Sequence, residues 1–96
     1  MELHELLEKV NDEESFLLFA KALIADRTIS IEKEEICPST SYDSDHNGWS
    51  NTSIKSFLEA AVAWAEDTNF GISQGIPSSN FWNRFASFLY CGKIYE

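Results

Sequence analysis

A cluster of aromatic residues near the C-terminus constrains the fold most strongly. At about 100° per residue, the apolar side chains between positions 81 and 90 cover an arc of about 180° around a helix axis. They are Phe81, Trp82, Phe85, Phe88, Leu89 and Tyr90. The pattern predicts a helix that begins at Ser79 or Asn80 and ends near Gly92, because glycine often adopts the left-handed conformation that follows a helix.

Three further segments show apolar residues at helical spacing. Residues 3–10 predict a short amphipathic helix. From about Glu13 to Asp26 the apolar side chains point all round the axis, which is typical of a helix at the centre of a bundle. A third helix, capped by Asn51 or Thr52, has one apolar stripe and carries Trp64 at the edge of this stripe. The stripe consists of Ile54, Phe57, Leu58, Ala61, Val62 and Ala65.

These segments predict an all-α fold. We expect a single helical domain over residues 1–96, built as a compact bundle of about four helices with one long irregular loop over about residues 28–50. Within that loop, residues 28–36 fit either a short strand or a weak extra helical turn. A loop of this length in so small a domain is functional or an insertion.

The charge of the chain excludes two classes of partner. The net charge is −9, and residues 1–50 carry 12 acidic and 4 basic side chains. Nucleic acids and anionic membranes would be repelled, because both are bound through Lys and Arg. A basic protein would be steered toward the N-terminal half. The alternative explanation of the acidic charge is that it keeps a small protein soluble. With no signal peptide in view, we expect a cytoplasmic protein with reduced thiols at Cys37 and Cys91.

One segment resembles the start of a calcium-binding loop. Asp43, Asp45 and Gly48 stand at the first, third and sixth positions of such a loop. The twelfth position requires a bidentate Glu but is Ile54, an apolar residue of the next helix. We therefore interpret the segment as a turn that leads into a helix.

Other candidate chemical sites are incomplete. His4 and Glu8 share a helix face, but no third metal ligand accompanies them. Cys37 and His46 lack a third catalytic member and an oxyanion hole. We therefore predict no enzymatic activity and no cofactor, and weak metal binding is retained only as a third alternative.

Protein binding is the leading functional hypothesis. The aromatic arc is wider than one core can cover, so Trp82, Phe85 and Leu89 are expected inside and other aromatic residues at the surface. The predicted partner surface consists of Trp49, Phe81, Phe88, Tyr90, Glu13 and Glu14. We expect a basic partner, as for small immunity or antitoxin-type inhibitors. The alternative is a homodimer in which the C-terminal helix pairs across a two-fold axis.

Two motifs also indicate a family. W-x-N-x-x-I-x-x-F-L-E-A-x-x-x-W-x-x-D runs from Trp49 to Asp67, and W-x-x-F-A-x-x-L-Y-x-G-K-I-Y-E runs from Trp82 to Glu96. With the approximate opening motif at residues 3–11, this pattern resembles a family of small acidic bacterial proteins classed as a domain of unknown function. The resemblance implies a compact helical protein, bacterial and cytoplasmic, with no established activity. It also implies that Trp49 and Asn51 form a helix-entry motif.

Overall fold

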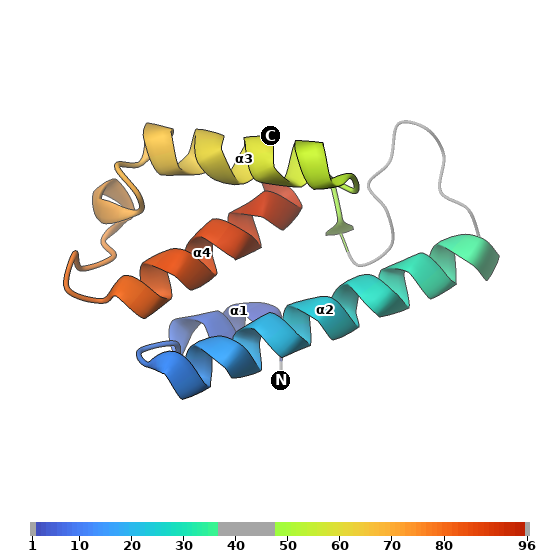
Figure 1. Ribbon diagram of the computed structural model, residues 1–96, viewed down its shortest axis with the longest axis horizontal. Coiled ribbons are helices and arrows are strands. Elements are labelled where there is room, and N and C mark those ends of the chain that lie inside the picture. Colours follow the sequence, from blue (N-terminus) through green and yellow to red (C-terminus); the bar gives the residue numbers. More distant parts are fainter. Residues whose placement is uncertain (1, 37–47, 96) are drawn as a thin grey trace.

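The computed structural model describes residues 2–36 and 48–95, and its regular elements are helices. In chain order these are α1 (Leu3–Glu8), α2 (Glu13–Ile36), α3 (Ile54–Asp67) and α4 (Phe81–Ile94), with the short 3-10 helix η2 (Ile72–Gln74) between the last two (Figure 1). The predicted all-α fold is confirmed.

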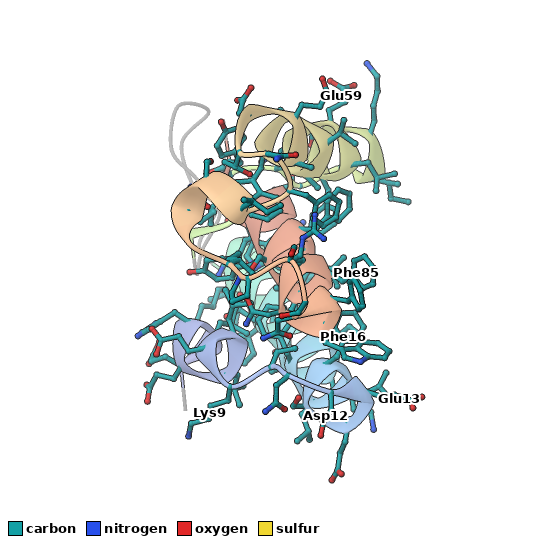
Figure 2. All side chains as sticks on the ribbon, turned by 90° about the vertical axis from the view of Figure 1, so that its left-hand side faces the viewer. Lys9, Asp12, Glu13, Phe16, Glu59 and Phe85 are labelled. Carbon is teal, nitrogen blue, oxygen red and sulfur yellow. The ribbon has the colours of Figure 1, made fainter. Side chains whose placement is uncertain are left out.

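The helix α4 is the central element. It packs against α3 on one side and against α1 and α2 on the other, while α2 and α3 are not packed on each other (Figure 1). An end-on view shows α1 and α2 side by side below α4, with α3 above it (Figure 2). The prediction that residues 13–26 form the central helix is therefore wrong. Because α2 lies at an outer edge, Leu17, Leu18 and Ile24 are exposed although the sequence suggested an all-round buried helix.

The helix α2 is longer than predicted. Residues 28–36 belong to it, so the irregular segment does not begin at residue 28. The Thr28 hydroxyl donates back to the Ile24 carbonyl (2.9 Å), and Ser30 is fully buried, so both polar residues are accommodated inside the helix. The Glu and Lys residues that follow are good helix formers. The remainder of the predicted loop, residues 37–47, lies outside the described residues.

The residue that caps the start of α3 is not the predicted Asn51 or Thr52. Ser53 caps this helix, because its hydroxyl accepts from the Ser56 amide (3.0 Å). Asn51 instead binds the C-terminal end of α4. Its side-chain amide donates to the carbonyls of Gly92 (3.1 Å) and Tyr95 (2.8 Å), and its backbone N–H donates to the Lys93 carbonyl (3.3 Å). Asn51 therefore satisfies carbonyls that the end of a helix leaves unpaired.

The two ends of α4 show one confirmed prediction and one correction. Asn80 caps the start, because its side chain accepts from the Asn83 amide (3.2 Å). Gly92 is not a left-handed cap, since α4 continues to Ile94. It is buried, and a Cβ atom there would lie 2.7 Å from Cζ of Phe57 on α3. The glycine thus lets α3 approach α4 closely.

Trp49 belongs to the core. Its ring is 5% exposed and it packs with Val10, Phe19, Leu23 and Ala86. Its indole N–H donates to Oδ2 of Asp26 (2.8 Å), the same oxygen that accepts from Nζ of Lys93 (2.9 Å). Trp49 therefore folds back into the protein, and it is not an exposed anchor for a partner.

Candidate protein-binding groove

An apolar groove of about 400 Å³ lies between α2 and α3. Leu23 and Ile24 line it from α2, and Ile54, Phe57 and Leu58 line it from α3. The groove exists because both helices pack on α4 but not on each other. The molecule measures 42 × 27 × 18 Å, and its short dimension is less than two helix diameters, so within residues 2–36 and 48–95 no further helix layer covers this side.

The walls of the groove carry large side chains that the fold leaves exposed. Ile54 is 83% exposed and Ile24 is 67% exposed. Leu58 and Val62 follow Ile54 at four-residue spacing on α3 and are also exposed. The interior face of α3 is a different one, formed by Ala61, Trp64 and their neighbours. The predicted stripe on α3 therefore covers two faces, of which only one is buried.

A separate aromatic patch lies on α2 and α4. Phe16 of α2 contacts Trp82 of α4, with 5.5 Å between ring centroids. Phe16 and Leu23 are seven residues apart and so lie on the same face of α2. Phe85 is 48% exposed, and Figure 2 shows Phe16 and Phe85 pointing to the same side of the molecule. We call the combined surface the open face. It comprises Phe16, Ile24, Ile54, Leu58, Phe81, Trp82 and Phe85.

The helices α2 and α3, which carry part of the open face, are acidic overall. Together α2 and α3 carry nine acidic and four basic residues. Glu13 and Glu14 occupy the first turn of α2, where the helix dipole favours negative charge, and Figure 2 shows Glu13 near Phe16. On α3, Glu59 forms an exposed ion pair with Lys55 (3.2 Å), which screens little of the surrounding charge. Both helices are therefore acidic overall, although the described residues that line the groove include Arg27 and no carboxylate.

The basic side chains nearest to the groove are engaged with the protein itself. The Arg27 guanidinium lies over the Trp49 ring, with 5.3 Å to its centroid. Arg84 donates from Nε to the Phe70 carbonyl (3.1 Å), and its guanidinium lies over the Phe70 ring. Lys93 is buried in its ion pair with Asp26. These contacts hold three of the cations of α2 and α4 in intramolecular interactions.

Only some residues of the predicted partner surface are exposed in the structure. Phe81, Glu13 and Glu14 are exposed, as expected. Phe88 and Tyr90 are half-buried, because Phe88 stacks on Phe70 (5.6 Å between centroids) and Tyr90 packs near Phe19 (6.4 Å). Trp82 and Phe85, which the sequence assigned to the core, are exposed instead. Each contacts one other aromatic ring, Trp82 that of Phe16 and Phe85 that of Phe70, and each stays at the surface.

The surface positions of Ile24, Ile54 and Leu58 were not predicted from the sequence. Their helical spacing placed them among residues expected to be buried. The composition gives no signal of this exposure, because 44% hydrophobic residues is ordinary for a soluble domain.

Among the candidate metal and thiol residues, His4, Glu8 and Cys91 do not line the groove. His4 and Glu8 lie exposed on α1, and among residues 2–36 and 48–95 no three His, Cys, Asp or Glu side chains gather as metal ligands would. Cys37, Asp43, Asp45 and His46 lie outside the described residues. Burial raises the pKa of the half-buried Cys91 thiol to about 11, which disfavours the reactive thiolate.

The described residues also include no helix with the length and apolar character that crossing a bilayer requires.

Comparison with known proteins gives one match. The model of a family of unknown function, DUF7660, matches residues 12–96, which includes α2, α3 and α4 and hence every residue of the open face. Searches of curated proteins and of solved structures found no match. The predicted resemblance to a domain of unknown function agrees with this result. Because the match covers most of the sequence, the chain belongs to the DUF7660 family.

Proposed function

We propose that this protein is a non-catalytic protein-binding module whose open face holds a basic protein partner, as in small immunity or antitoxin-type inhibitors. The observation that carries the proposal is the exposure of large apolar side chains from three helices toward one side. Ile24, Ile54 and Phe85 represent these helices. Contiguous apolar surfaces of this kind mark interaction sites on soluble proteins.

The energetics favour a macromolecular partner. Burying one aliphatic or aromatic side chain contributes about 1.5–3 kcal/mol, so several such residues can support a stable complex. Protein interfaces typically have an aromatic centre and a polar rim. The aromatic pair Phe16–Trp82 with the neighbouring Glu13 and Glu14 matches this arrangement.

Self-association is a second candidate function. Phe81 and Phe85 on α4 are exposed and lie four residues apart, so they could pair with the same residues of a second copy across a two-fold axis. Each copy would bring a net charge of −9, which opposes association at low salt. A dimer in analytical ultracentrifugation at low salt would favour this alternative over a basic partner.

A matched pair of variants tests the proposed function. Ile24 and Ile29 are both exposed isoleucines of α2, but Ile24 lines the groove and Ile29 lines a separate hollow that includes His4 and Tyr90. Wild-type protein, Ile24→Glu and Ile29→Glu would each be immobilised and exposed to a lysate of the producing cells at low salt. Captured proteins would be eluted by salt and quantified.

The proposed function predicts that one basic protein is captured by the wild type and by Ile29→Glu but is strongly reduced with Ile24→Glu. Circular dichroism would verify that both variants are folded. Equal capture by the two variants would show that the open face is not the binding surface. Capture that does not depend on salt would contradict the role of the acidic side chains.

A further inference from the structure

The outer side of α3 combines exposed apolar side chains with carboxylates. Figure 2 shows Glu59 on the side of α3 that points away from α4. A hollow of about 440 Å³ lies on α3, and its described lining residues are three apolar and three acidic ones, with no basic side chain among them: Leu58, Val62, Ala63, Glu59, Glu66 and Asp67. The groove between α2 and α3 differs from this hollow, because its one charged lining residue among those described is Arg27.

We propose that the hollow on α3 binds a basic amphipathic helix of the protein partner, an inference that rests on the proposed function. Leu58 lines both the hollow and the groove, so a partner that covers the groove can reach the hollow without a break in contact. The juxtaposition that supports the proposal is an exposed apolar row on α3 directly beside carboxylates of the same helix.

The charges of α3 favour a basic occupant. Lys55 is the one basic residue of this helix, and its exposed ion pair with Glu59 (3.2 Å) neutralises only one of three acidic side chains. Asp67 accepts a hydrogen bond from the neutral Tyr95 hydroxyl and keeps its charge. Lys or Arg side chains would therefore be attracted to the hollow and acidic ones repelled. A second copy, with a net charge of −9, is a poorer occupant for the same reason.

The spacing of two carboxylates matches a helix better than a strand. Glu59 and Glu66 are seven residues apart, so they lie on the same side of α3, about 10.5 Å from each other along its axis at 1.5 Å per residue. Two basic residues at i and i+7 of a partner helix have the same separation. Residues on one side of a strand are about 6.8 or 13.6 Å apart, so a strand cannot place one base opposite each carboxylate as closely.

The apolar row also has the form of a helix-packing ridge. Ile54, Leu58 and Val62 are exposed and follow each other at four-residue spacing. Such i, i+4 rows form the ridges that enter the grooves of a second helix. Val62 lies three residues after Glu59 and four before Glu66, so apolar residues of the partner helix would lie between its two bases, at i+3 and i+4.

Three synthetic peptides of about 18 residues test this pattern. The first has Lys at every seventh position and Leu three and four residues after each Lys, with Ala and Gln elsewhere, so that Lys and Leu share one side of a helix. The second has the same composition and the same Leu positions, but its Lys residues lie on the opposite side. The third has Glu in place of each Lys of the first. Each peptide is titrated into the full-length ¹⁵N-labelled protein, and amide signals are followed by NMR.

We expect the first peptide to bind saturably, to become helical by circular dichroism, and to shift the amide signals of Leu58, Val62 and Glu66. The second and third peptides should bind about fivefold more weakly or less. Val62→Ser should also weaken binding of the first peptide, because Val62 lines the hollow and does not line the groove.

A matched pair of protein variants separates a local contact from general attraction. Glu59→Gln/Glu66→Gln and Glu32→Gln/Glu35→Gln each remove two negative charges, but Glu32 and Glu35 are exposed on α2 and line neither the hollow nor the groove. The first double variant should weaken binding of the first peptide by about fivefold or more, and the second by less than about twofold. Circular dichroism would verify that both are folded.

Other outcomes would overturn the inference. Equal weakening by the two double variants would show general attraction to an acidic protein, and equal binding of the second or third peptide would remove the spacing or the charge argument. A dimer in analytical ultracentrifugation that Val62→Ser abolishes would show that a second copy occupies the hollow. If no peptide binds saturably, the inference fails, but the proposed function stands as long as capture of a basic protein depends on Ile24 and not on Ile29.

Discussion

At the residue scale, one oxygen atom links three parts of the chain. Oδ2 of Asp26 on α2 accepts from the Trp49 indole and from Lys93 of α4. The Lys93 side chain is 8% exposed and that of Asp26 is 21% exposed, so neither charge can be left alone without a desolvation penalty. This cluster fixes the segment that precedes α3 against both α2 and α4.

We predict that Lys93→Met lowers the free energy of unfolding by about 3 kcal/mol, because it leaves the Asp26 carboxylate buried without its cation. The double variant Asp26→Asn/Lys93→Met should recover part of this loss. It removes the unpaired charge, and the Asn side-chain oxygen can still accept from the Trp49 indole. Urea unfolding followed by tryptophan fluorescence measures both values. A double variant less stable than Lys93→Met would contradict the charge explanation.

A second prediction concerns the reactivity of Cys91. Burial raises the pKa of its thiol from 9.0 to about 11, so the thiolate fraction near pH 8 falls about a hundredfold. In a Cys37→Ser background, iodoacetamide should alkylate Cys91 far more slowly in the folded protein than in urea. Mass spectrometry of timed samples gives both rates. Comparable rates in the two conditions would show that the thiol is not shielded.

At the scale of the elements, Gly92 determines how closely α3 lies on α4. An added Cβ would meet three atoms of the Phe57 ring at 2.7–2.9 Å. Gly92→Ala should improve helix propensity by about 1 kcal/mol, but the displacement of the ring should cost more than this gain. We therefore predict a net loss of about 1–2 kcal/mol in the free energy of unfolding.

Combining Gly92→Ala with Phe57→Leu provides the control. A leucine can move away from the new methyl group, so the double variant should lose less stability than the two single variants added together. Strict additivity in thermal or urea unfolding would mean that Gly92 and Phe57 do not constrain each other.

The sequence predicted where the helices lie in the chain better than which residues they contact. Asn80 was recognisable as a cap because its side chain satisfies the first turn of α4. The role of Asn51 could not be found locally, because its partners Gly92 and Tyr95 are more than forty residues away. Residues 28–36 have a composition that permits strand or helix, and only their continuity with α2 decides between the two.

At the scale of the whole molecule, the arrangement of the helices decides which apolar stripes are buried. The spacing of Ile54, Leu58 and Val62 is as regular as that of the buried positions on α3. Because α2 and α3 are both attached to α4 and separated from each other, Ile54 and Leu58 face a groove and not a core, and Val62 is also exposed. Helical periodicity defines the faces of a helix, but it does not determine which face meets another helix. The open face could therefore be identified only from the structure.

The exposure of the open face leads to a prediction about stability. Ile54→Ala should change the free energy of unfolding by no more than about 0.5 kcal/mol, because the side chain is 83% exposed. Leu23→Ala, which removes a buried side chain at the inner edge of the same groove, should cost about 2–5 kcal/mol. Urea unfolding compares the two variants. A large loss for Ile54→Ala would mean that this residue is covered within the protein itself.

Hydrogen–deuterium exchange on the complex with the captured partner tests the open face as the binding surface most directly. We predict slower exchange on binding at amides of α2 between about residues 16 and 28 and of α3 between about residues 54 and 62, which carry the walls of the groove. Exchange in α1, Leu3–Glu8, should not change. Protection that is confined to α1, or that spares both walls of the groove, would contradict the assignment of the open face as the binding surface.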